Sequence, residues 1–306
     1  MRNKTMLVIL SVLLPFFVSV FVRDAVTGQE IAPAQLRSRR VPNIDMFMAN
    51  WKDIKSRKVY GTMEVWDILT KLEGDPLRPK RKGAVLTDLN VVSYAIVKAY
   101  GSTRPMTLES RQQVYYIVSG KGIIRTEKKT VEIHEEVGIL MPPGIEFSMT
   151  NTGGEALAMY IIEEPVAPGF SPRKNMIVRY EYENEISTNI RRVNSDNWLF
   201  SLEDGLSTLV SFNPIMFEPM SLVPPHVHEP GVEEVWIAVK GELQIQVGSQ
   251  RRSFPVGSAY KVPANGRTPH SNINNTDSSK KLLWMMKVPL PQGPANGTPQ
   301  NRKGVI

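Results

Sequence analysis

Short runs of branched and aromatic residues, separated by glycine, proline and asparagine, dominate the chain from about residue 61 onward. Runs of this length, with turn residues between them, are typical of antiparallel strands in a sandwich or barrel. They include 91–99, 114–119, 156–162, 208–212, 235–239 and 282–288. The pattern therefore predicts an all-β fold that follows a short polar extension.

The same pattern of strands and turns occurs twice along the chain. The segment 114–122 (VYYIVSGKG) aligns with 235–243 (VWIAVKGEL), and 141–151 aligns with 262–274. In each pair, the second segment begins 121 positions after the first. A constant offset at two separate landmarks indicates that one β domain is duplicated in tandem, at a period longer than that of a solenoid repeat.

The length of 306 residues, 42% of them hydrophobic, is enough for two such domains with a core each. Proline and glycine gather at 164–169 and mark a boundary between them. The expected organisation is a signal peptide at 1–28, an N-terminal extension at 29–60, a first β domain at 61–164, a linker at 165–200, a second β domain at 201–288 and a disordered tail at 289–306.

Residues 1–28 have the layout of a leader for export. Two positive charges precede an apolar run at 6–22, and Gly28 supplies a small residue where a signal peptidase would cut. An uncleaved membrane anchor is the alternative, but Pro15 interrupts a run at the short limit for spanning a bilayer. We expect a periplasmic or secreted mature chain that begins near Gln29 and has no stable membrane anchor.

Charge and cysteine content narrow the function classes further. The chain has 37 basic and 30 acidic residues and no cysteine. The mild positive excess is not concentrated on one segment, so it gives no argument for a nucleic-acid partner. Without cysteine the chain has no disulfide, and it has no Ser-nucleophile signature, phosphate loop or nucleotide fingerprint either.

Two of the chain's four histidines, His226 and His228, stand one residue apart. Side chains alternate along an extended strand, so these two imidazoles would point the same way and could share one metal ion. The apolar run at 235–239 predicts a strand whose first residues bring a glutamate beside them. For an isolated H-x-H pair, solvated histidines next to ordinary charge are the more frequent arrangement. The choice between a metal site and solvated histidines therefore depends on the other residues of the second copy.

The second copy resembles the cupin pattern, in which H-x-H, a spacer and E-x6-G are followed by a second motif with proline, histidine and asparagine. The matching residues are His226, His228, Glu234, Gly241, Gly257, Pro263, His270 and Asn274. The spacer before the glutamate is one residue longer than in the pattern, and the second motif has P-x-x-G. Glu233 and Glu234 thus remain alternatives as acidic ligand, and the six-residue step to Gly241 favours Glu234.

The resemblance implies a bicupin, that is, two tandem jelly-roll (cupin) barrels over roughly 61–288. In cupins three imidazoles and one carboxylate hold a divalent metal ion with positions left open for substrate. It implies that His226, His228, Glu234 and His270 bind one divalent ion, and this donor set suits Mn, Fe, Ni, Cu or Zn. Burial of four ionisable groups in one apolar barrel would be costly without an ion.

The first copy departs from the pattern at the ligand positions. Gln113 replaces the glutamate, Phe147 replaces the second-motif histidine, and 105–108 contain no histidine. His134 lies away from the motif and is expected to be a surface residue. We therefore expect a metal-free first barrel that packs against the second, dimerises, or shapes the site of its partner.

The resemblance favours a metal-dependent enzyme acting on a small oxygen-rich molecule at the second barrel, of the dioxygenase, isomerase, lyase or decarboxylase type. The alternative is a non-catalytic exported bicupin that binds a sugar or a metal. Tyr260 is a candidate acid or proton carrier and Trp236 a candidate wall of the pocket, although each type is more often a packed barrel residue. Asn272 shares the face of His270, whereas Trp284 is expected in the core. The expected partners are a small-molecule substrate and, as one alternative, a second copy of the chain.

Overall fold

The computed structural model describes residues 42–184, 186–189 and 194–288, all within one compact unit. The expected signal peptide and C-terminal tail lie outside the described residues, as do residues 29–41 of the expected extension. Within the described part, no helix is both long enough and apolar enough to cross a membrane.

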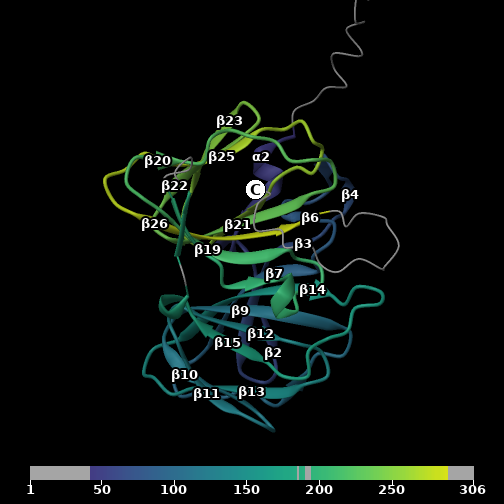
Figure 1. The fold of residues 1–306 in the computed structure, drawn as a ribbon, viewed down its shortest axis with the longest axis vertical. Coiled ribbons are helices and arrows are strands. Elements are labelled where there is room, and N and C mark those ends of the chain that lie inside the picture. The colour runs from purple at the N-terminus through teal and green to yellow at the C-terminus, as the bar shows by residue number, and fades with distance from the viewer. Residues whose placement is uncertain (1–41, 185, 190–193, 289–306) are drawn as a thin grey trace, which may run out of the picture. The chain divides into compact units, whose positions relative to one another are not determined.

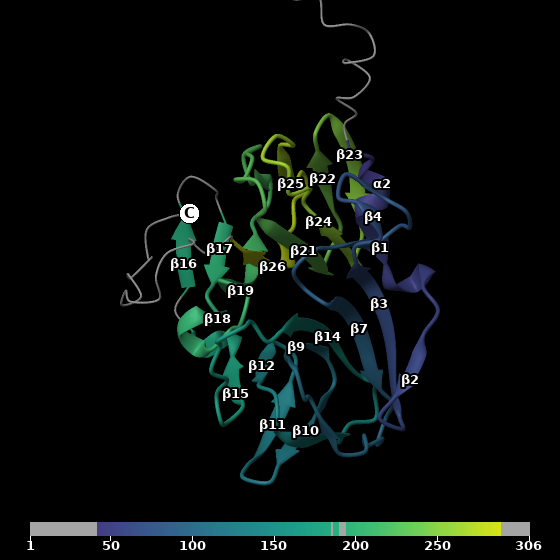
Figure 2. The ribbon, with the colours of Figure 1, turned by 90° about the vertical axis from the view of Figure 1, so that its right-hand side faces the viewer.

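The first barrel consists of a large sheet, antiparallel apart from one short strand, and a small antiparallel sheet (Figures 1 and 2). The large sheet has the order β15 (Ile177–Tyr180), β12 (Val137–Met141), β9 (Arg111–Ser119), β14 (Leu157–Pro165), β7 (Val91–Val97), β3 (Met63–Lys71), β2 (Arg57–Val59), with β6 (Ala84–Leu86) parallel to β3. The small sheet has the order β11 (Thr130–His134), β10 (Lys121–Thr126), β13 (Glu146–Asn151), β8 (Met106–Thr107), and β4 (Gly74–Asp75) pairs with β5 (Arg78–Pro79) outside the barrel sheets.

The second barrel repeats this arrangement. Its large sheet has the order β1 (Met48–Asn50), β24 (Ser258–Lys261), β21 (Glu233–Lys240), β26 (Lys280–Lys287), β19 (Ser211–Phe217), β17 (Asn194–Asn197), β16 (Ile186–Asn189), with β18 (Phe200–Ser201) on β19. The small sheet has the order β20 (Ser221–Leu222), β25 (His270–Asn274), β22 (Leu243–Val247), β23 (Gln250–Phe254). The order β12–β9–β14–β7 recurs as β24–β21–β26–β19, which confirms the predicted all-β fold and duplication.

Helical turns occupy only short connections in the described residues. They are α2 (Ile44–Phe47) and the 3-10 turns η1 (Trp51–Asp53), η2 (Glu181–Glu183) and η3 (Leu202–Asp204). Asn43 caps α2 with its side chain, which accepts a hydrogen bond from the Asp45 N–H.

The two large sheets pack back to back, so the protein has three apolar cores. Alternation along β21 illustrates the arrangement: Trp236 and Ala238 face the interior of the second barrel, whereas Val235 and Ile237 face the first barrel. On the other side of that contact Tyr116 and other residues of the first barrel complete the core between the barrels. Because both faces of β21 are buried, its sequence is an almost continuous apolar run.

The strands that precede each copy are exchanged between the barrels. Strand β1 comes before the first copy but pairs with β24 of the second, and β15 comes before the second copy but pairs with β12 of the first. The segment 165–200, expected to be a linker, thus contributes β15 to one barrel and β17 to the other. Extension and linker are structural parts of the two sheets because each supplies a strand that covers an open edge.

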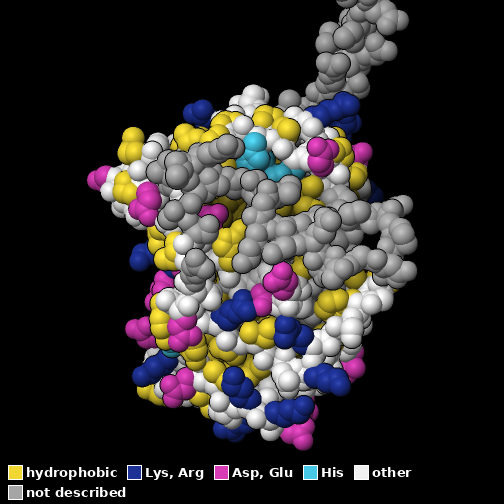
Figure 3. Space-filling view, viewed as in Figure 1, with side chains coloured by type: hydrophobic (Ala, Val, Ile, Leu, Met, Phe, Trp, Pro, Cys, Tyr) yellow, Lys and Arg dark blue, Asp and Glu magenta, His cyan; other side chains and the backbone are white. Residues whose placement is uncertain are grey.

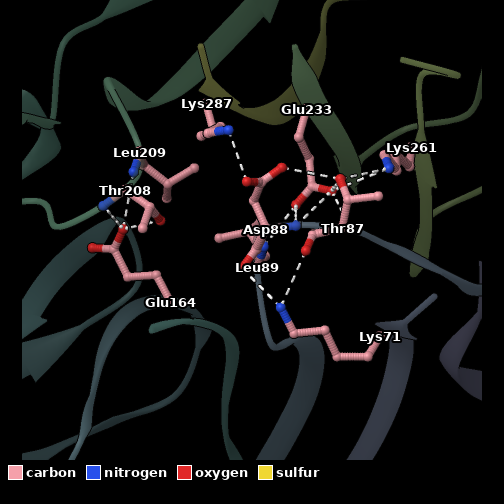
Figure 4. Close-up of polar contacts among 10 residues, drawn as sticks. All are labelled: Lys71, Thr87, Asp88, Leu89, Glu164, Thr208, Leu209, Glu233, Lys261 and Lys287. Atoms are coloured by element: carbon pink, nitrogen blue, oxygen red, sulfur yellow. Dashed lines mark hydrogen bonds and ion pairs between the residues drawn. The ribbon is translucent and has the colours of Figure 1, made fainter. Parts of the chain in front are cut away.

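Two buried glutamates join the barrels in related ways (Figure 4). Glu233 of β21 accepts hydrogen bonds from the backbone and hydroxyl of Thr87 (2.6 and 2.7 Å) and from the Leu89 N–H (2.8 Å), in the loop that leads into β7. Glu164 of β14 accepts hydrogen bonds from the N–H groups of residues 207–209, in the loop that leads into β19. Each barrel therefore holds the lead-in loop of the other through one carboxylate.

Candidate metal centre

Three segments of the second barrel bring four potential ligands together. His226 and His228 lie in the connection from β20 to β21, Glu234 is on β21, and His270 begins β25. The backbones of His226 and His270 exchange two hydrogen bonds, of 3.2 and 3.0 Å, which fixes the connection against β25. One ligand atom from each of the four residues lies within 4.8 Å of all the others.

The centre lies where the barrel interior meets the surface. Glu234 and His270 are buried, whereas His226 and His228 are partly exposed. Figure 3 shows histidine side chains at the surface of the second barrel, among hydrophobic side chains. The two partly exposed imidazoles therefore lie on the solvent side of the centre.

The ligand atoms point toward a common position. Glu234 Oε2 lies 2.8 Å from His228 Nε2 and 2.7 Å from His270 Nε2. His270 Nε2 lacks the alignment that a hydrogen bond to this oxygen needs, and neither nitrogen of this fully buried ring has a hydrogen-bond partner. A buried imidazole nitrogen that lacks a hydrogen bond is costly, and a metal ion bound at Nε2 would give that nitrogen a partner.

Contacts outside the cluster engage one atom of Glu234 and one atom of His226. The Trp284 indole N–H donates to Glu234 Oε1 at 2.6 Å, so that Oε2 remains for an ion. His226 Nδ1 lies 2.9 Å from the carbonyl oxygen of Pro224, which requires a proton on Nδ1 and leaves Nε2 as the free nitrogen. Outer contacts of this kind orient the ligands of metal sites.

The protonation states also suit a metal. Burial tends to raise the pKa of Glu234, but the charge of the adjacent His270 and the hydrogen bond from His228 outweigh it and hold that pKa well below its usual range. Burial, followed by repulsion from His270, lowers the pKa of His226 from 6.5 to about 4. At neutral pH the centre therefore presents a carboxylate and a neutral His226, the forms that bind metal.

The structure separates the two adjacent glutamates that the sequence left as alternatives. Glu234 faces the interior of the barrel with the three histidines, whereas Glu233 faces the first barrel and lies 3.1 Å from Lys261. Side chains of neighbouring strand residues point to opposite faces, so only one of the two can join the cluster.

The two residues predicted to act beside the metal are both inside the second barrel. Tyr260 is fully buried, its hydroxyl donates to Asn272 Oδ1 at 3.0 Å, and burial raises its pKa well above 10. The Trp236 ring lies 6.1 Å from the Trp284 ring, and its N–H has no partner. Their catalytic roles stay predictions.

Trp284 was expected only to pack in the core, and its contact with Glu234 was missed. A strand register would have revealed this role, because β26 pairs with β21 and places Trp284 opposite Trp236 on the inward face. Single-sequence patterns give the face of a residue but not its neighbour on the next strand.

The first barrel has other side chains at the ligand positions. Gln113 accepts a hydrogen bond from the Tyr115 hydroxyl, and Phe147 is buried against Tyr115 in the interior. The fourth histidine, His134, ends β11 and stacks on Tyr180. Among the described residues, the group in the second barrel is the one set of three or more histidine, cysteine or acidic side chains placed to hold an ion.

Comparison with known proteins agrees with this geometry. Residues 215–286 match the cupin domain family model. No significant match was found among curated protein sequences.

Among solved structures, a putative glyoxylate-induced protein from Pseudomonas aeruginosa is similar (TM-score 0.63, 13% identity, 79% of this chain and 87% of that chain). So are oxalate decarboxylase from Lactobacillus farciminis in a formate complex (0.61, 12%, 81% and 88%) and oxalate decarboxylase from Bacillus subtilis, described with Mn(II) centres (0.59, 12%, 80% and 78%). At these identities the similarity establishes the fold. The second barrel thus contains the residues that match the cupin domain family, and the two tandem jelly-roll barrels fit a bicupin architecture.

Proposed function

We propose that the protein is a metal-dependent enzyme that acts on a small oxygen-rich molecule at its second barrel. The convergence of three imidazoles and one carboxylate, with ligand atoms within 4.8 Å of one another, carries the proposal. Two further features support it. The contacts that Glu234 and His226 make outside the cluster involve Glu234 Oε1 and His226 Nδ1, so that Oε2 and Nε2 face the centre. Two oxalate decarboxylases have a similar fold, and one of them is described with Mn(II) centres.

The residues of the centre have distinct roles in this proposal. His226, His228, Glu234 and His270 would hold a divalent ion, and that ion would supply Lewis-acid polarisation of the oxygen atoms of a substrate. Trp284 keeps Glu234 Oε1 occupied, so the carboxylate offers one oxygen only. Tyr260 carries its proton at neutral pH, and burial raises its pKa further, which suits a hydrogen-bond donor better than a base.

Metal content and turnover test the proposal together. Elemental analysis of purified protein should find about one divalent ion per chain, lost in His228→Ala and kept in His134→Ala, the matched change in the first barrel. The metal-loaded protein should then turn over one member of a panel of catechols, flavonoids, keto acids and uronates under air. Metal without turnover, together with saturable binding of a sugar, would favour the non-catalytic alternative.

We also propose that the protein is exported. The support is the leader-like layout of residues 1–28, with charge, an apolar run and a small residue in order. N-terminal sequencing of the mature protein should begin near Gln29. Recovery of Met1 on membrane-bound protein would contradict export as a cleaved chain.

A further inference from the structure

The interior of the second barrel contains polar side chains that have no partner although they are buried. Asn213 and Asn272 are fully buried, and Trp236 is 3% exposed. Both polar atoms of the Asn213 side chain, the Asn272 amide nitrogen and the Trp236 indole nitrogen lack a hydrogen bond. Such groups are rare inside proteins because each loses its bonds to water without a replacement.

These side chains form one layer next to the candidate metal centre. Asn213 lies opposite Trp284 on β26, Trp284 opposite Trp236 on β21, and Trp236 opposite Tyr260 on β24. Trp236, Trp284 and Tyr260 belong to the core of the second barrel, and Asn213 alternates onto the same face of β19 as Ile215 and Phe217. The hydrogen bond from Tyr260 to Asn272 extends the layer to the small sheet. Trp284 connects this layer to the candidate metal centre, because its indole N–H donates a hydrogen bond to Glu234.

The first barrel serves as an internal control for this layer. Its matching row is Ser93, Ile161, Tyr115 and Ile139, by the same strand pairing. The Ser93 hydroxyl donates to Asp67 at 2.8 Å and the Tyr115 hydroxyl donates to Gln113. The barrel without the ligand set thus fills this layer with apolar or paired groups, whereas the barrel with the ligand set leaves Asn213 and Trp236 of this layer unpaired.

The unpaired atoms are mostly donors. Trp236 offers an indole N–H, Asn272 offers its amide N–H groups because Tyr260 occupies its oxygen, and Asn213 offers both donors and one acceptor. A divalent ion with Glu234 as its one anionic ligand adds a net positive charge beside them. A ligand rich in acceptor oxygens and carrying negative charge complements this arrangement, whereas a sugar would also need acceptors for its hydroxyl protons.

We infer that Asn213, Trp236 and Asn272 form the substrate-recognition layer of the second barrel, and that the substrate is a small carboxylate with further oxygen atoms. This inference rests on the proposed function, because it takes the ion to lie in the adjacent centre. Asn213 and Trp236 are then specificity-determining residues, whose unpaired state in the free protein is explained by the ligand that they bind.

The test uses the full chain loaded with Mn²⁺ and isothermal titration calorimetry with oxalate, pyruvate and glycolate, with xylose as the neutral comparison. At least one carboxylate should bind the parent, and Asn213→Leu and Trp236→Phe should each weaken it by about 10- to 100-fold with the metal content unchanged. Ser93→Ala, the matched change in the first barrel, should leave that affinity as it is.

Thermal unfolding of the metal-free variants gives a second readout. Asn213→Leu should raise the melting temperature by a few degrees, because an apolar group of similar size replaces an unpaired amide. If Asn213→Leu leaves the carboxylate affinity unchanged and lowers the melting temperature, Asn213 is a packing residue. That result would overturn this inference but not the proposed function. Binding of xylose instead of any carboxylate would overturn the substrate class, and absence of metal from the parent would overturn the proposed function as well.

Discussion

The change of Glu233 to glutamine tests in a single experiment which of the two adjacent glutamates binds the metal and which joins the barrels. Glu233 is fully buried between the barrels, where its two oxygens receive the donors of Thr87 and Leu89 and lie near the buried ammonium of Lys261. Glutamine has the same shape but one acceptor oxygen and no charge. We expect Glu233→Gln to destabilise the protein while the metal stays bound.

The magnitude follows from the contacts. The amide nitrogen of glutamine would face a donor, either the Leu89 N–H or the Thr87 pair, so at least one charge-assisted hydrogen bond of about 1.5–3 kcal/mol is lost. Lys261 keeps its bond to the Val85 carbonyl (2.8 Å) but loses the compensating carboxylate. Loss of one partner of a buried pair costs about 3–5 kcal/mol, and we expect a loss of this size.

Urea unfolding monitored by tryptophan fluorescence measures the loss, and elemental analysis measures the metal. Glu242→Gln is the control, because Glu242 is exposed in the turn after β21 and glutamine can keep the hydrogen bond that Ser253 donates to it. This change should alter the free energy of unfolding by about 0.5 kcal/mol or less. A Glu233 variant that is as stable as this control, or that loses its metal, would refute the assignment of Glu233 to the contact between the barrels.

Three further predictions follow from the centre and the chain ends. Glu234→Gln should remove the one anionic ligand and leave the purified protein with little metal by elemental analysis, whereas Gln113→Glu should not add a second ion. The pKa of His226 in the folded protein is lowered from 6.5 to about 4, so between these values the unfolded chain binds more protons. The metal-free protein should therefore be most stable above about pH 6.5 and lose stability as the pH falls toward 4, which denaturation at a series of pH values would check. Mass spectrometry of the exported chain should give a start near Gln29, and a mass that includes residues 1–28 would contradict processing.

Local patterns in the sequence are enough to predict the fold class, and the ligand cluster follows from the resemblance to a family pattern. Turn residues and short apolar runs predict the strands, and the resemblance of the second copy to the cupin motifs implies the convergence of His226, His228 and His270. These features depend on residues close in sequence or on a repeated spacing, which one sequence contains in full.

Features that depend on pairing between distant strands could not be predicted. The exchange of β1 and β15 has no local signature, since an edge strand is defined by its partner. Asn213 resembles a turn residue by type, yet it lies inside β19 beside Trp284. Glu233 and Glu234 differ only in the face of the strand they occupy, and the one-residue insertion before them obscured which face was which.

The exchange of the lead-in strands means that no single cut in the chain yields two intact halves. A fragment that begins at residue 194 would retain all four proposed ligands but lose β1, whose Asn50 side chain also donates to Ser258 (2.9 Å). The edge of β24 would then be free to pair with another molecule, which is a route to aggregation. Engineering of an isolated metal-binding half would therefore require residues 43–50 to be grafted beside β24 or supplied as a separate peptide.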